Sequence, residues 1–370
     1  MTLGEHGSPR DAEYMRLALE LGRRGLGRTR PNPPVGAVVV RGGRVVGSGW
    51  HRRAGTAHAE AIALEQAGAA ARGATLYVTL EPCTHQGRMP PCAPRVIESG
   101  VQRVVIGAID PNPLVSRRGV AQLRRAGVAV TTGVESAASM DLIAAFARHV
   151  VTGRPFVRLK LAASADGRIA TRTGASRWIT GAPARRLVHR WRNEMDAVMV
   201  GVDTVIADDP ELTCRRAGGR DPVRVVVDGR LRIPPRARLL HDGRGPVWIA
   251  TRTRHDRARA ARLGRDGATI LPVVARGPHL DLGALLVTLG RRDLTSVLVE
   301  AGAALSAALI AGGHVDELCW FSAPLLIGGD GLPMIGPLGV RSLRGAFPLS
   351  DLRVERVGDD LLHTARVEAR

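Results

Sequence analysis

The chain has 370 residues, 45% of them hydrophobic, which suits two domains with sizeable cores and excludes a chain disordered by composition. Its formal net charge is +19, but the arginines are scattered and aromatic residues make up only 3%, so we expect no nucleic-acid partner. Apolar runs are too short to span a bilayer, and the N-terminus lacks a signal-peptide core. We therefore expect a cytoplasmic protein without a membrane partner, whose cysteines are thiols or metal ligands.

The first half of the chain alternates helix and strand signals. A helix is predicted over 11–22 with Asp11 as its N-cap, and a β-hairpin over 35–49 with glycines in its turn. The later elements are helices at 58–68, 91–100, 119–127 and 135–150 and strands at 74–82, 101–109 and 128–134. Helices interleaved with β-branched strands predict a three-layer α/β domain.

Glycine and proline in TGRPF, residues 152–156, interrupt this pattern. We place a domain boundary there, which gives domains at 1–152 and 153–370. The second half alternates again, with predicted strands at 157–164, 197–202, 223–228 and 296–300, helices at 183–196 and after 301–305, and long strands at 315–327 and 352–368. This pattern predicts a second α/β domain.

One histidine and two cysteines of the first half match a catalytic zinc site. Such a site takes three protein ligands and leaves the fourth position to water, and His58, Cys83 and Cys92 would make that set. Glu60 is placed to shuttle protons between the activated water and a leaving amine. The pattern follows the H-x-E…P-C-x-x-C signature of zinc nucleobase deaminases, except that eight residues separate the two cysteines.

The local structure must meet two conditions for this site. His58 and Glu60 are two residues apart, so they converge only if they lie at a helix end. Cys92 opens a predicted helix, whose N-terminus favours the thiolate that zinc requires. Either motif alone would be weak, because HAE arises often by chance and paired cysteines are usually plain thiols.

Taken in order, these segments resemble the bifunctional riboflavin-biosynthesis deaminase–reductase family. The first half carries PNPPVGAVVV (31–40), GSGWHRRAGTAHAE (47–60), ATLYVTLEPCTHQGRMPPC (74–92) and DPNP (110–113). The second half carries RPFVRLKLAASADGRIA (154–170), SRWIT (176–180), ADDPELT (207–213) and VEAG (299–302). The resemblance covers nearly the whole chain, in both halves.

The resemblance implies a cytidine-deaminase-like three-layer α/β domain followed by a dihydrofolate-reductase-like α/β domain. The first would remove the 2-amino group of 2,5-diamino-6-(5-phosphoribosylamino)pyrimidin-4-one with zinc-activated water, one zinc ion per chain. The second would use NADPH to reduce the ribosyl group of the resulting 5-amino-6-(5-phosphoribosylamino)uracil to ribityl. We also expect a homo-oligomer.

The residues between the two cysteines are a candidate substrate loop. His85 and Arg88 would contact the base or the ribose phosphate, although they could equally be solvated loop residues. Asn32 can pair with a pyrimidine edge through both its donor and its acceptor. His51 and Asp110 are weaker candidates for the same pocket, and His51 could be an ordinary histidine of the core or surface.

The second half has no G-x-G-x-x-G after a strand, so a Rossmann site is not indicated. The best phosphate-binding turn is Gly302, Ala303, Ala304, Leu305 and Ser306, which follows a strand and opens a helix. By resemblance, further residues line the cofactor: Ala162, Trp178, Thr204 and Asp208. By resemblance, others line the substrate: Ser176, Arg192, Leu212, Arg215 and Glu300. Arg192 and Arg215 could bind its phosphate in bidentate fashion, and Trp178 could stack on the nicotinamide or fill the core.

Two features of the sequence need separate explanations. Lys160 is the only lysine in the chain, and we expect it to supply a compact ammonium to the reductase substrate site, although its position could equally be chance. Residues 115–119, VSRRG, replace the glycine-rich turn that usually follows DPNP in the family, so Arg117 could alter the deaminase rim.

The alternative functions are a reductase with a degenerate deaminase half, and a nucleic-acid deaminase or binding protein that uses the positive charge.

Overall fold

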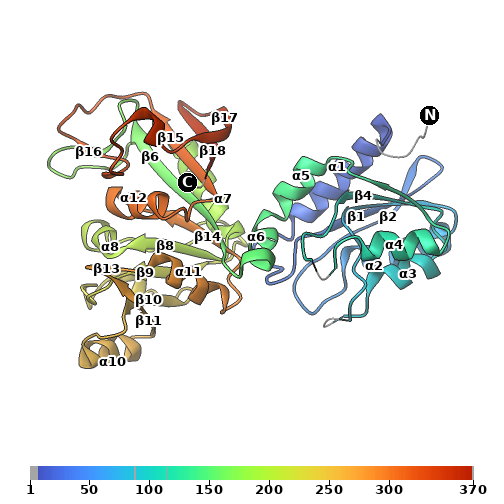
Figure 1. Cartoon of the computed structure of the whole chain (residues 1–370), viewed down its shortest axis with the longest axis horizontal. Coiled ribbons are helices and arrows are strands. Elements are labelled where there is room, and N and C mark those ends of the chain that lie inside the picture. The colour runs from blue at the N-terminus through green and yellow to red at the C-terminus, as the bar shows by residue number, and fades with distance from the viewer. Residues whose placement is uncertain (1–6, 87–88, 114, 369–370) are drawn as a thin grey trace. The chain divides into compact units, whose positions relative to one another are not determined.

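The computed structural model describes residues 7–86, 89–113 and 115–368. The chain forms two compact units, Met1–Arg154 and Pro155–Arg370, drawn in Figure 1. None of the helices formed by the described residues is long and apolar enough to cross a membrane.

The first unit is built on a five-stranded sheet in the order β2-β1-β3-β4-β5. Strands β1 and β2 form the expected antiparallel hairpin, while β3, β4 and β5 run parallel. The strands are β1 (Gly36–Arg41), β2 (Arg44–Trp50), β3 (Thr75–Leu80), β4 (Arg103–Ala108) and β5 (Ala129–Thr132). The helices are α1 (Pro9–Arg23), α2 (Ala59–Ala67), α3 (Cys92–Glu98), α4 (Arg118–Arg125), α5 (Ser136–Leu142) and α6 (Ala144–Thr152), with a 3₁₀ turn η1 (Gly68–Ala71).

Helices cover both faces of this sheet, which confirms the three-layer α/β expectation. Helices α1 and α5 lie on one face, and α2, α3 and α4 lie on the other (Figure 1). The strands β1, β3 and β4 are almost entirely buried between these layers.

Two local predictions for the first unit were wrong. Ser8 rather than Asp11 caps α1, and Asp11 closes a capping box from the third helical position. The carboxylate of Asp11 is buried and accepts two hydrogen bonds from Arg103, at 2.9 and 3.0 Å, and one from Tyr77 at 2.9 Å. The single helix expected over 135–150 is divided into α5 and α6 at Ile143.

Glycines in β2 allow α2 to approach the sheet closely. A Cβ at Gly47 would lie 2.1 Å from the carbonyl oxygen of Ala63, and one at Gly49 would lie 2.7 Å from that of Ala59. Any larger residue would push the helix outward, because real Cβ atoms do not come so close to another heavy atom. These two contacts fix α2 against β2, and the first turn of α2 carries the predicted catalytic Glu60.

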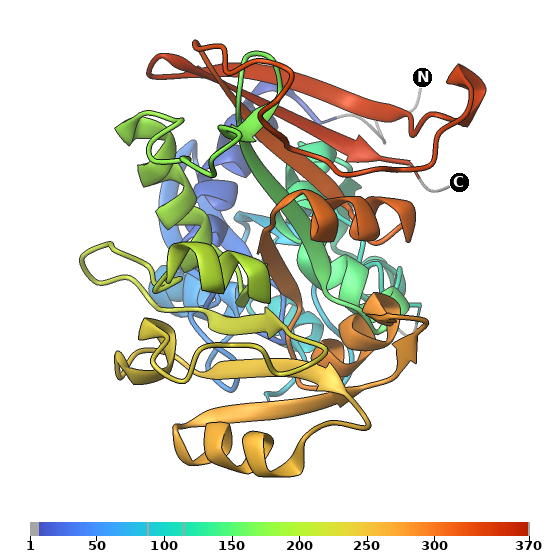
Figure 2. The same cartoon turned by 90° about the vertical axis from the view of Figure 1, so that its left-hand side faces the viewer.

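The second unit contains a nine-stranded sheet in the order β11-β10-β9-β8-β14-β6-β15-β18-β17. The strands from β11 to β15 are parallel, and the last two are antiparallel. They are β6 (Phe156–Ser164), β8 (Ala197–Gly201), β9 (Val223–Val227), β10 (Val247–Arg252), β11 (Ala268–Val273), β14 (Ser296–Glu300), β15 (Glu317–Ala323), β17 (Leu349–Val357) and β18 (Asp360–Val367). Figure 2 looks onto this sheet, with the red C-terminal hairpin at the top.

Shorter elements complete the second unit. Its helices are α7 (Ala182–Glu194), α8 (Val202–Asp208), α9 (Arg238–His241), α10 (Arg257–Arg265), α11 (Leu282–Gly290) and α12 (Ala303–Ala311). The remaining pieces are β7 (Arg168–Ala170), β12 (Ala275–Arg276), β13 (His279–Leu280), β16 (Leu332–Pro333) and the 3₁₀ turn η2 (Leu343–Gly345). Alternate residues of β14 belong to two separate core clusters, so both faces of the sheet are covered.

The two long C-terminal strands differ from the prediction. The stretch 352–368 forms part of the hairpin β17–β18 instead of one strand, because Gly358 reverses the chain with a φ of 70°. The strand expected over 315–327 ends at Ala323. The expected α/β class of this half is confirmed.

Candidate active sites

Three potential metal ligands meet in the first unit. The Nδ1 atom of His58 lies 3.2 Å from Sγ of Cys92 and 3.7 Å from Sγ of Cys83. All three ligand atoms lie within 4.8 Å of one another. His58 is the N-cap of α2, Cys92 is the first residue of α3, and Cys83 follows β3. Elements far apart in sequence therefore bring one nitrogen and two sulfurs to one point.

The donor set fits a zinc ion. Nitrogen and two sulfurs are a common zinc ligand set, and thiolates are the form that binds. The pKa of Cys83 is lowered to about 4, chiefly because its sulfur accepts a hydrogen bond from the Cys92 thiol. Burial opposes this shift, and a hydrogen bond with His58 adds to it. The pKa of Cys92 is raised, because its thiol donates to Cys83 and is buried. The hydrogen bond to Cys83 also raises the pKa of His58.

Glu60 lies in the first turn of α2, beside this cluster. Its side chain is buried, and burial followed by the negative charge of Cys83 raises its pKa to about 7. The helix start satisfies the condition derived from the sequence, since His58 has an extended backbone with ψ of 164° just before the helix. A carboxyl group with a pKa near neutrality can both accept and return a proton.

His51 and Asn32 lie next to the metal ligands. The Nδ2 atom of Asn32 lies 3.1 Å from Nε2 of His51, whose Nδ1 lies 3.2 Å from the carbonyl oxygen of Ala57. The His51 and His58 rings pack edge to face with centroids 5.1 Å apart. Burial lowers the pKa of His51, which favours its neutral form. The substrate roles of both residues stay predictions.

Asp110 is held near the site by a residue that the sequence analysis missed. Glu81 is buried and its Oε2 accepts the N–H of Asp110 at 3.2 Å, while Asp110 accepts the N–H of Asn112 at 2.8 Å. Glu81 directly precedes the Pro82-Cys83 motif, which was its only sequence signal. Of the predicted substrate loop, His85 is exposed, and Arg88 lies outside the described residues.

In the second unit, three predicted substrate residues form one ionic cluster. Arg192 donates from Nε to Oε1 of Glu300 at 2.6 Å and from Nη2 to Oε2 at 3.0 Å, and from Nη1 to the carbonyl of Thr213 at 3.0 Å. The ammonium of Lys160 lies 4.0 Å from the same carboxylate. Parallel pairing of β14 with β6 explains this contact, because it aligns Glu300 with Lys160.

Electrostatics keep this cluster charged despite burial. Burial opposes ionisation of Glu300, but the charge and hydrogen bonds of Arg192 and the charge of Lys160 outweigh it and lower its pKa to about 2. Burial also lowers the pKa of Lys160, against the attraction of Glu300.

The other predicted substrate residues are Leu212, Arg215 and Ser176. Leu212 is buried with a left-handed φ of 57°. Arg215 is exposed, and its Nη2 donates to Glu211 at 3.1 Å. Ser176 is half-buried, in a loop before α7. The roles of these three residues stay predictions.

The predicted cofactor residues lie on several different strands and helices. Gly302 is the extended N-cap of α12, so the backbone N–H groups of Ala303, Ala304 and Leu305 lie at a free helix start. Ser306 is fully buried and its hydroxyl donates to the carbonyl oxygen of Gly302 at 2.9 Å, so its side chain stabilises the first turn of α12.

The remaining predicted cofactor residues are more accessible. Trp178 is 67% exposed, so it does not fill the core, and the Arg185 guanidinium lies 4.7 Å from its ring centroid. The carbonyl oxygen of Asp208 accepts a hydrogen bond from Arg177 at 2.6 Å. Thr204 on α8 and Ala162 on β6 are half-buried.

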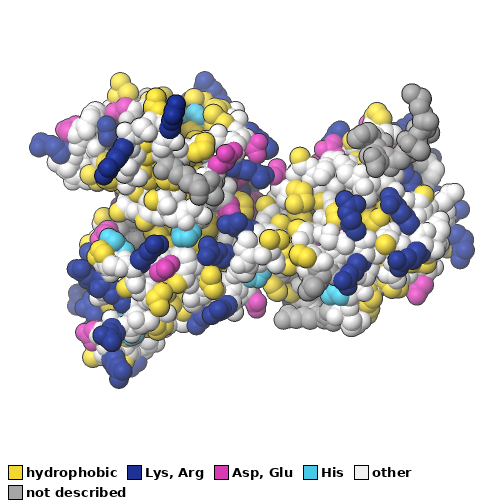
Figure 3. Space-filling view, viewed as in Figure 1, with side chains coloured by type: hydrophobic (Ala, Val, Ile, Leu, Met, Phe, Trp, Pro, Cys, Tyr) yellow, Lys and Arg dark blue, Asp and Glu magenta, His cyan; other side chains and the backbone are white. Residues whose placement is uncertain are grey.

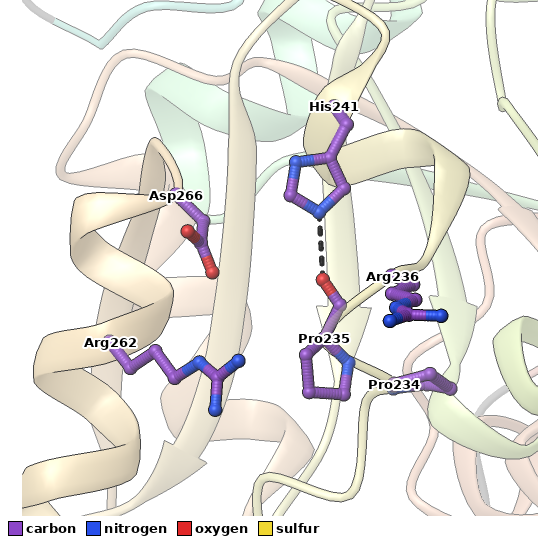
Figure 4. A pocket seen from close by; sticks show the side chains of 6 residues that line it. All are labelled: Pro234, Pro235, Arg236, His241, Arg262 and Asp266. Carbon is purple, nitrogen blue, oxygen red and sulfur yellow. Dashed lines mark hydrogen bonds between the residues drawn. The ribbon is translucent and has the colours of Figure 1, made fainter.

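A depression of about 490 Å³ on the second unit lies apart from all these predicted residues. Figure 4 shows its lining side chains, which come from the segment before α9 and from α9 and α10: Pro234, Pro235, Arg236, His241, Arg262 and Asp266. His241 donates from Nε2 to the carbonyl of Pro235 at 2.7 Å. Its lining contains neither the metal ligands nor the ionic cluster.

The fold and these clusters define a zinc-dependent deaminase joined to a reductase. The family described as the cytidine and deoxycytidylate deaminase zinc-binding region matches residues 8–108, and the RibD C-terminal domain matches residues 155–363. The chain belongs to the RibD family of riboflavin biosynthesis proteins and combines deaminase and reductase activities. Zinc serves the first and NADPH the second.

Full-length relatives support this assignment. The riboflavin biosynthesis protein RibD of Aquifex aeolicus is 42% identical over 95% of this chain and 97% of its own length. That of Escherichia coli K12 is 41% identical over 95% of this chain and 98% of its own length. The solved structure of Acinetobacter baumannii RibD is 38% identical, with a TM-score of 0.86 over 97% of this chain and 99% of that one.

A second solved structure carries a more detailed description. A Thermotoga maritima protein is 36% identical, with a TM-score of 0.84 over 97% of this chain and 99% of that one. It is described as a diaminohydroxyphosphoribosylaminopyrimidine deaminase and 5-amino-6-(5-phosphoribosylamino)uracil reductase.

Proposed function

We propose that the first unit hydrolyses the 2-amino group of 2,5-diamino-6-(5-phosphoribosylamino)pyrimidin-4-one, and that the second reduces the ribosyl group of the product to ribityl. The domains would correspond to residues 1–152 and 153–370. The observation that carries the proposal is the convergence of His58, Cys83 and Cys92 beside the buried Glu60. The description of the Thermotoga relative supports the choice of substrates.

In the deaminase unit, His58, Cys83 and Cys92 would hold the metal. Zinc in such a site activates water at neutral pH. Glu60 takes one proton from the attacking water and passes it to the ring nitrogen, and it then moves the remaining hydroxyl proton to the amino group, so that ammonia leaves and a carbonyl remains. Burial keeps the Glu60 proton affinity high enough for both transfers.

Recognition of the pyrimidine would fall to the polar groups around the ligands. Asn32 offers an amide to the base edge, and its contact with His51 orients it. Asp110 lies on the loop that Glu81 fixes. His85 and Arg88, in the loop between the two cysteines, would reach the ribose phosphate.

In the reductase unit, the ionic cluster would bind the ribosyl phosphate substrate. NADPH supplies the hydride. Arg192 is already held by Glu300 and Thr213, so its position is fixed before substrate binds. Lys160 keeps a compact ammonium beside Glu300, where it can donate to a sugar oxygen.

The intact metal cluster weighs against a reductase with a degenerate deaminase half.

We propose further that the protein is cytoplasmic and uses neither nucleic acid nor membrane as a partner. On the face shown in Figure 3, dark-blue cationic side chains are spread out and interspersed with acidic ones. A nucleic-acid surface would favour a continuous basic stripe.

A homo-oligomer is proposed from the edge of the second sheet. Strand β17 is an edge strand, and Leu349, Leu352 and Val354 on it are 43%, 57% and 53% exposed. A second copy of the chain would cover these apolar side chains. Sedimentation of the native chain and of Leu352→Glu tests this: the variant should shift toward monomer.

Two assays on the same preparation test the proposed function. The diaminopyrimidinone substrate should release ammonia without NADPH, and the deaminated product should then oxidise one equivalent of NADPH. Metal analysis should find about one zinc per chain. Ammonia release that does not depend on zinc would defeat the deaminase half, and failure to oxidise NADPH with the deaminated product would defeat the reductase half.

A further inference from the structure

We propose that His189 is a positioning residue of the reductase substrate site: its imidazole holds the backbone of Arg215, so that the Arg215 guanidinium is in place to bind the substrate phosphate. This inference rests on the proposed function, because it takes Arg192 and Arg215 as the ligands of that phosphate. The motifs that indicated the site do not include His189.

Helix α7 presents two polar residues to the same stretch of chain. His189 and Arg192 are three residues apart, so they lie on one face of the helix. Arg192 donates from Nη1 to the carbonyl oxygen of Thr213 at 3.0 Å, and Arg215 donates its backbone N–H to Nδ1 of His189 at 3.4 Å. The thiol of Cys214 donates to the carbonyl oxygen of His189, also at 3.4 Å. One turn of α7 thus contacts three consecutive residues of the substrate site.

The stretch that α7 contacts has little regular structure of its own. Residues 209–222, between α8 and β9, form no helix or strand. Leu212 has a left-handed φ of 57°, which a non-glycine residue keeps only where its surroundings hold it. The side chain of Arg215 is exposed and donates from Nη2 to Glu211 at 3.1 Å, and exposed ion pairs of this kind fix a side chain only weakly. The backbone contact with His189 is therefore the firmer constraint on Arg215.

The surroundings of His189 keep its ring neutral, as this contact requires. Burial lowers its pKa below the ordinary 6.5, and the positive charges of Arg192 and Arg215 lower it further. Glu300 and a hydrogen bond with the Thr213 backbone oppose this shift. A neutral imidazole carries hydrogen on only one nitrogen, so Nδ1 accepts the Arg215 N–H while Nε2 carries the hydrogen. His189 thus leaves the positive charge of the site to the two arginines.

A phosphate site gains from an arginine that is already in place. Bidentate binding needs the guanidinium plane to face two phosphate oxygens, and ordering a loose side chain at that moment weakens the affinity. His189 fixes the Arg215 backbone against the same turn of α7 that carries Arg192. We therefore expect His189 to strengthen binding of the substrate phosphate and to leave hydride transfer unaffected.

Two substitutions of nearly equal shape test this role. Asn and Leu have the same branched outline, but only Asn offers an oxygen in place of the imidazole Nδ1. His189→Leu should raise KM for the deaminated product at least tenfold, with kcat and KM for NADPH within twofold of the native values. His189→Asn should bring that KM back to within threefold of native. Arg186→Gln, at an exposed arginine of the same helix, is the control and should change none of these values.

A double-mutant cycle shows whether His189 acts through Arg215. Arg215→Gln alone should raise KM for the deaminated product, and adding His189→Leu should then change it less than twofold, because the guanidinium that His189 positions is gone. An effect of His189→Leu that is as large without the Arg215 guanidinium as with it would overturn the proposal.

Calorimetry with ribose 5-phosphate measures the same effect without catalysis. His189→Leu should weaken its binding at least tenfold and His189→Asn less than threefold. Should His189→Leu fail to fold, His189→Met takes its place with the same expected values. Native affinity for ribose 5-phosphate in the folded Leu or Met variant would overturn this inference alone, whereas a native chain that oxidises no NADPH with the deaminated product would instead defeat the proposed function.

Discussion

The carboxylate of Glu81 accepts the backbone N–H of Arg117 at 2.9 Å, across 36 residues of sequence. The same carboxylate accepts the N–H groups of Asp110 at 3.2 Å and Val120 at 3.1 Å. A Cβ on Gly119 would lie 2.2 Å from the carbonyl oxygen of Pro82, so α4 begins in direct contact with this chain segment. Glu81 thereby joins the segment that leads to Cys83 to the loop that carries Asp110.

We predict that Glu81→Ala destabilises the first unit by about 3 kcal/mol, because it leaves three backbone N–H groups without their acceptor. Urea unfolding measures the loss, and hydrogen exchange should accelerate at the amides of Asp110, Arg117 and Val120. Glu98→Ala, at an exposed glutamate of the same unit, is the control and should change stability little. Unchanged exchange at the three amides would contradict the role given to Glu81.

Arg117 occupies a left-handed conformation with φ of 62°, at the N-cap of α4. Non-glycine residues pay about 1–2 kcal/mol for this conformation. Arg117→Gly should therefore stabilise the first unit by up to about 1 kcal/mol, since glycine also loses more chain entropy, while Arg117→Val should destabilise it. Thermal unfolding compares the two, and a Val variant as stable as the Gly variant would contradict the prediction.

The half-buried Glu300 should make the stability of the second unit depend on pH. Its pKa falls from the ordinary 4.5 to about 2, because Arg192 and Lys160 outweigh the effect of burial. A depressed pKa contributes stability above the unfolded-state pKa, and this contribution is lost as the pH falls through the folded-state pKa. The shift corresponds to about 3 kcal/mol at pH 7.

Glu300→Gln should accordingly be less stable than the native chain at pH 7, and the difference should shrink steadily between about pH 5 and pH 2. Urea unfolding at several pH values measures it. Glu355→Gln, at an exposed carboxylate of β17, is the control. A difference between native chain and Glu300→Gln that stays constant down to pH 2 would count against the ionic cluster.

Zinc binding should depend on Cys92 but not on the buried Cys214 of the second unit. Cys92→Ser removes one thiolate of the predicted set and should lower zinc content from about one per chain to a small fraction. Ammonia release should disappear with the metal, while NADPH oxidation with the deaminated product should persist. Cys214→Ser should retain both zinc and ammonia release; a full zinc complement in Cys92→Ser would mean that the metal lies elsewhere.

Local signals in the sequence were enough to predict most of the helices and strands. Glycines 42 and 43 marked the β1–β2 turn, and both have the positive φ expected of a tight hairpin. The order of HAE, a helix, a strand and PPC indicated the metal cluster before its distances were known. In the second unit, Lys160 and Glu300 were assigned separately to the substrate site, and their contact follows from the parallel pairing of β14 with β6, which no local pattern indicated.

Long-range contacts explain what local patterns missed. Asp11 was predicted as the N-cap of the first helix, but Ser8 has that role. The Asp11 carboxylate instead accepts a hydrogen bond from Arg103, which lies on the distant strand β4. Glu81 gave no periodic signal, because its three partners are backbone groups 29 to 39 residues away.

Glu60→Gln most directly tests the central claim, which is that Glu60 moves protons for deamination and takes no part in the reduction. Ammonia release from the diaminopyrimidinone should fall by about 10²–10⁴-fold. Zinc content and NADPH oxidation with the deaminated product, measured on the same preparation, should match those of the native chain. Ammonia release at the native rate from a zinc-loaded Glu60→Gln chain would contradict the account.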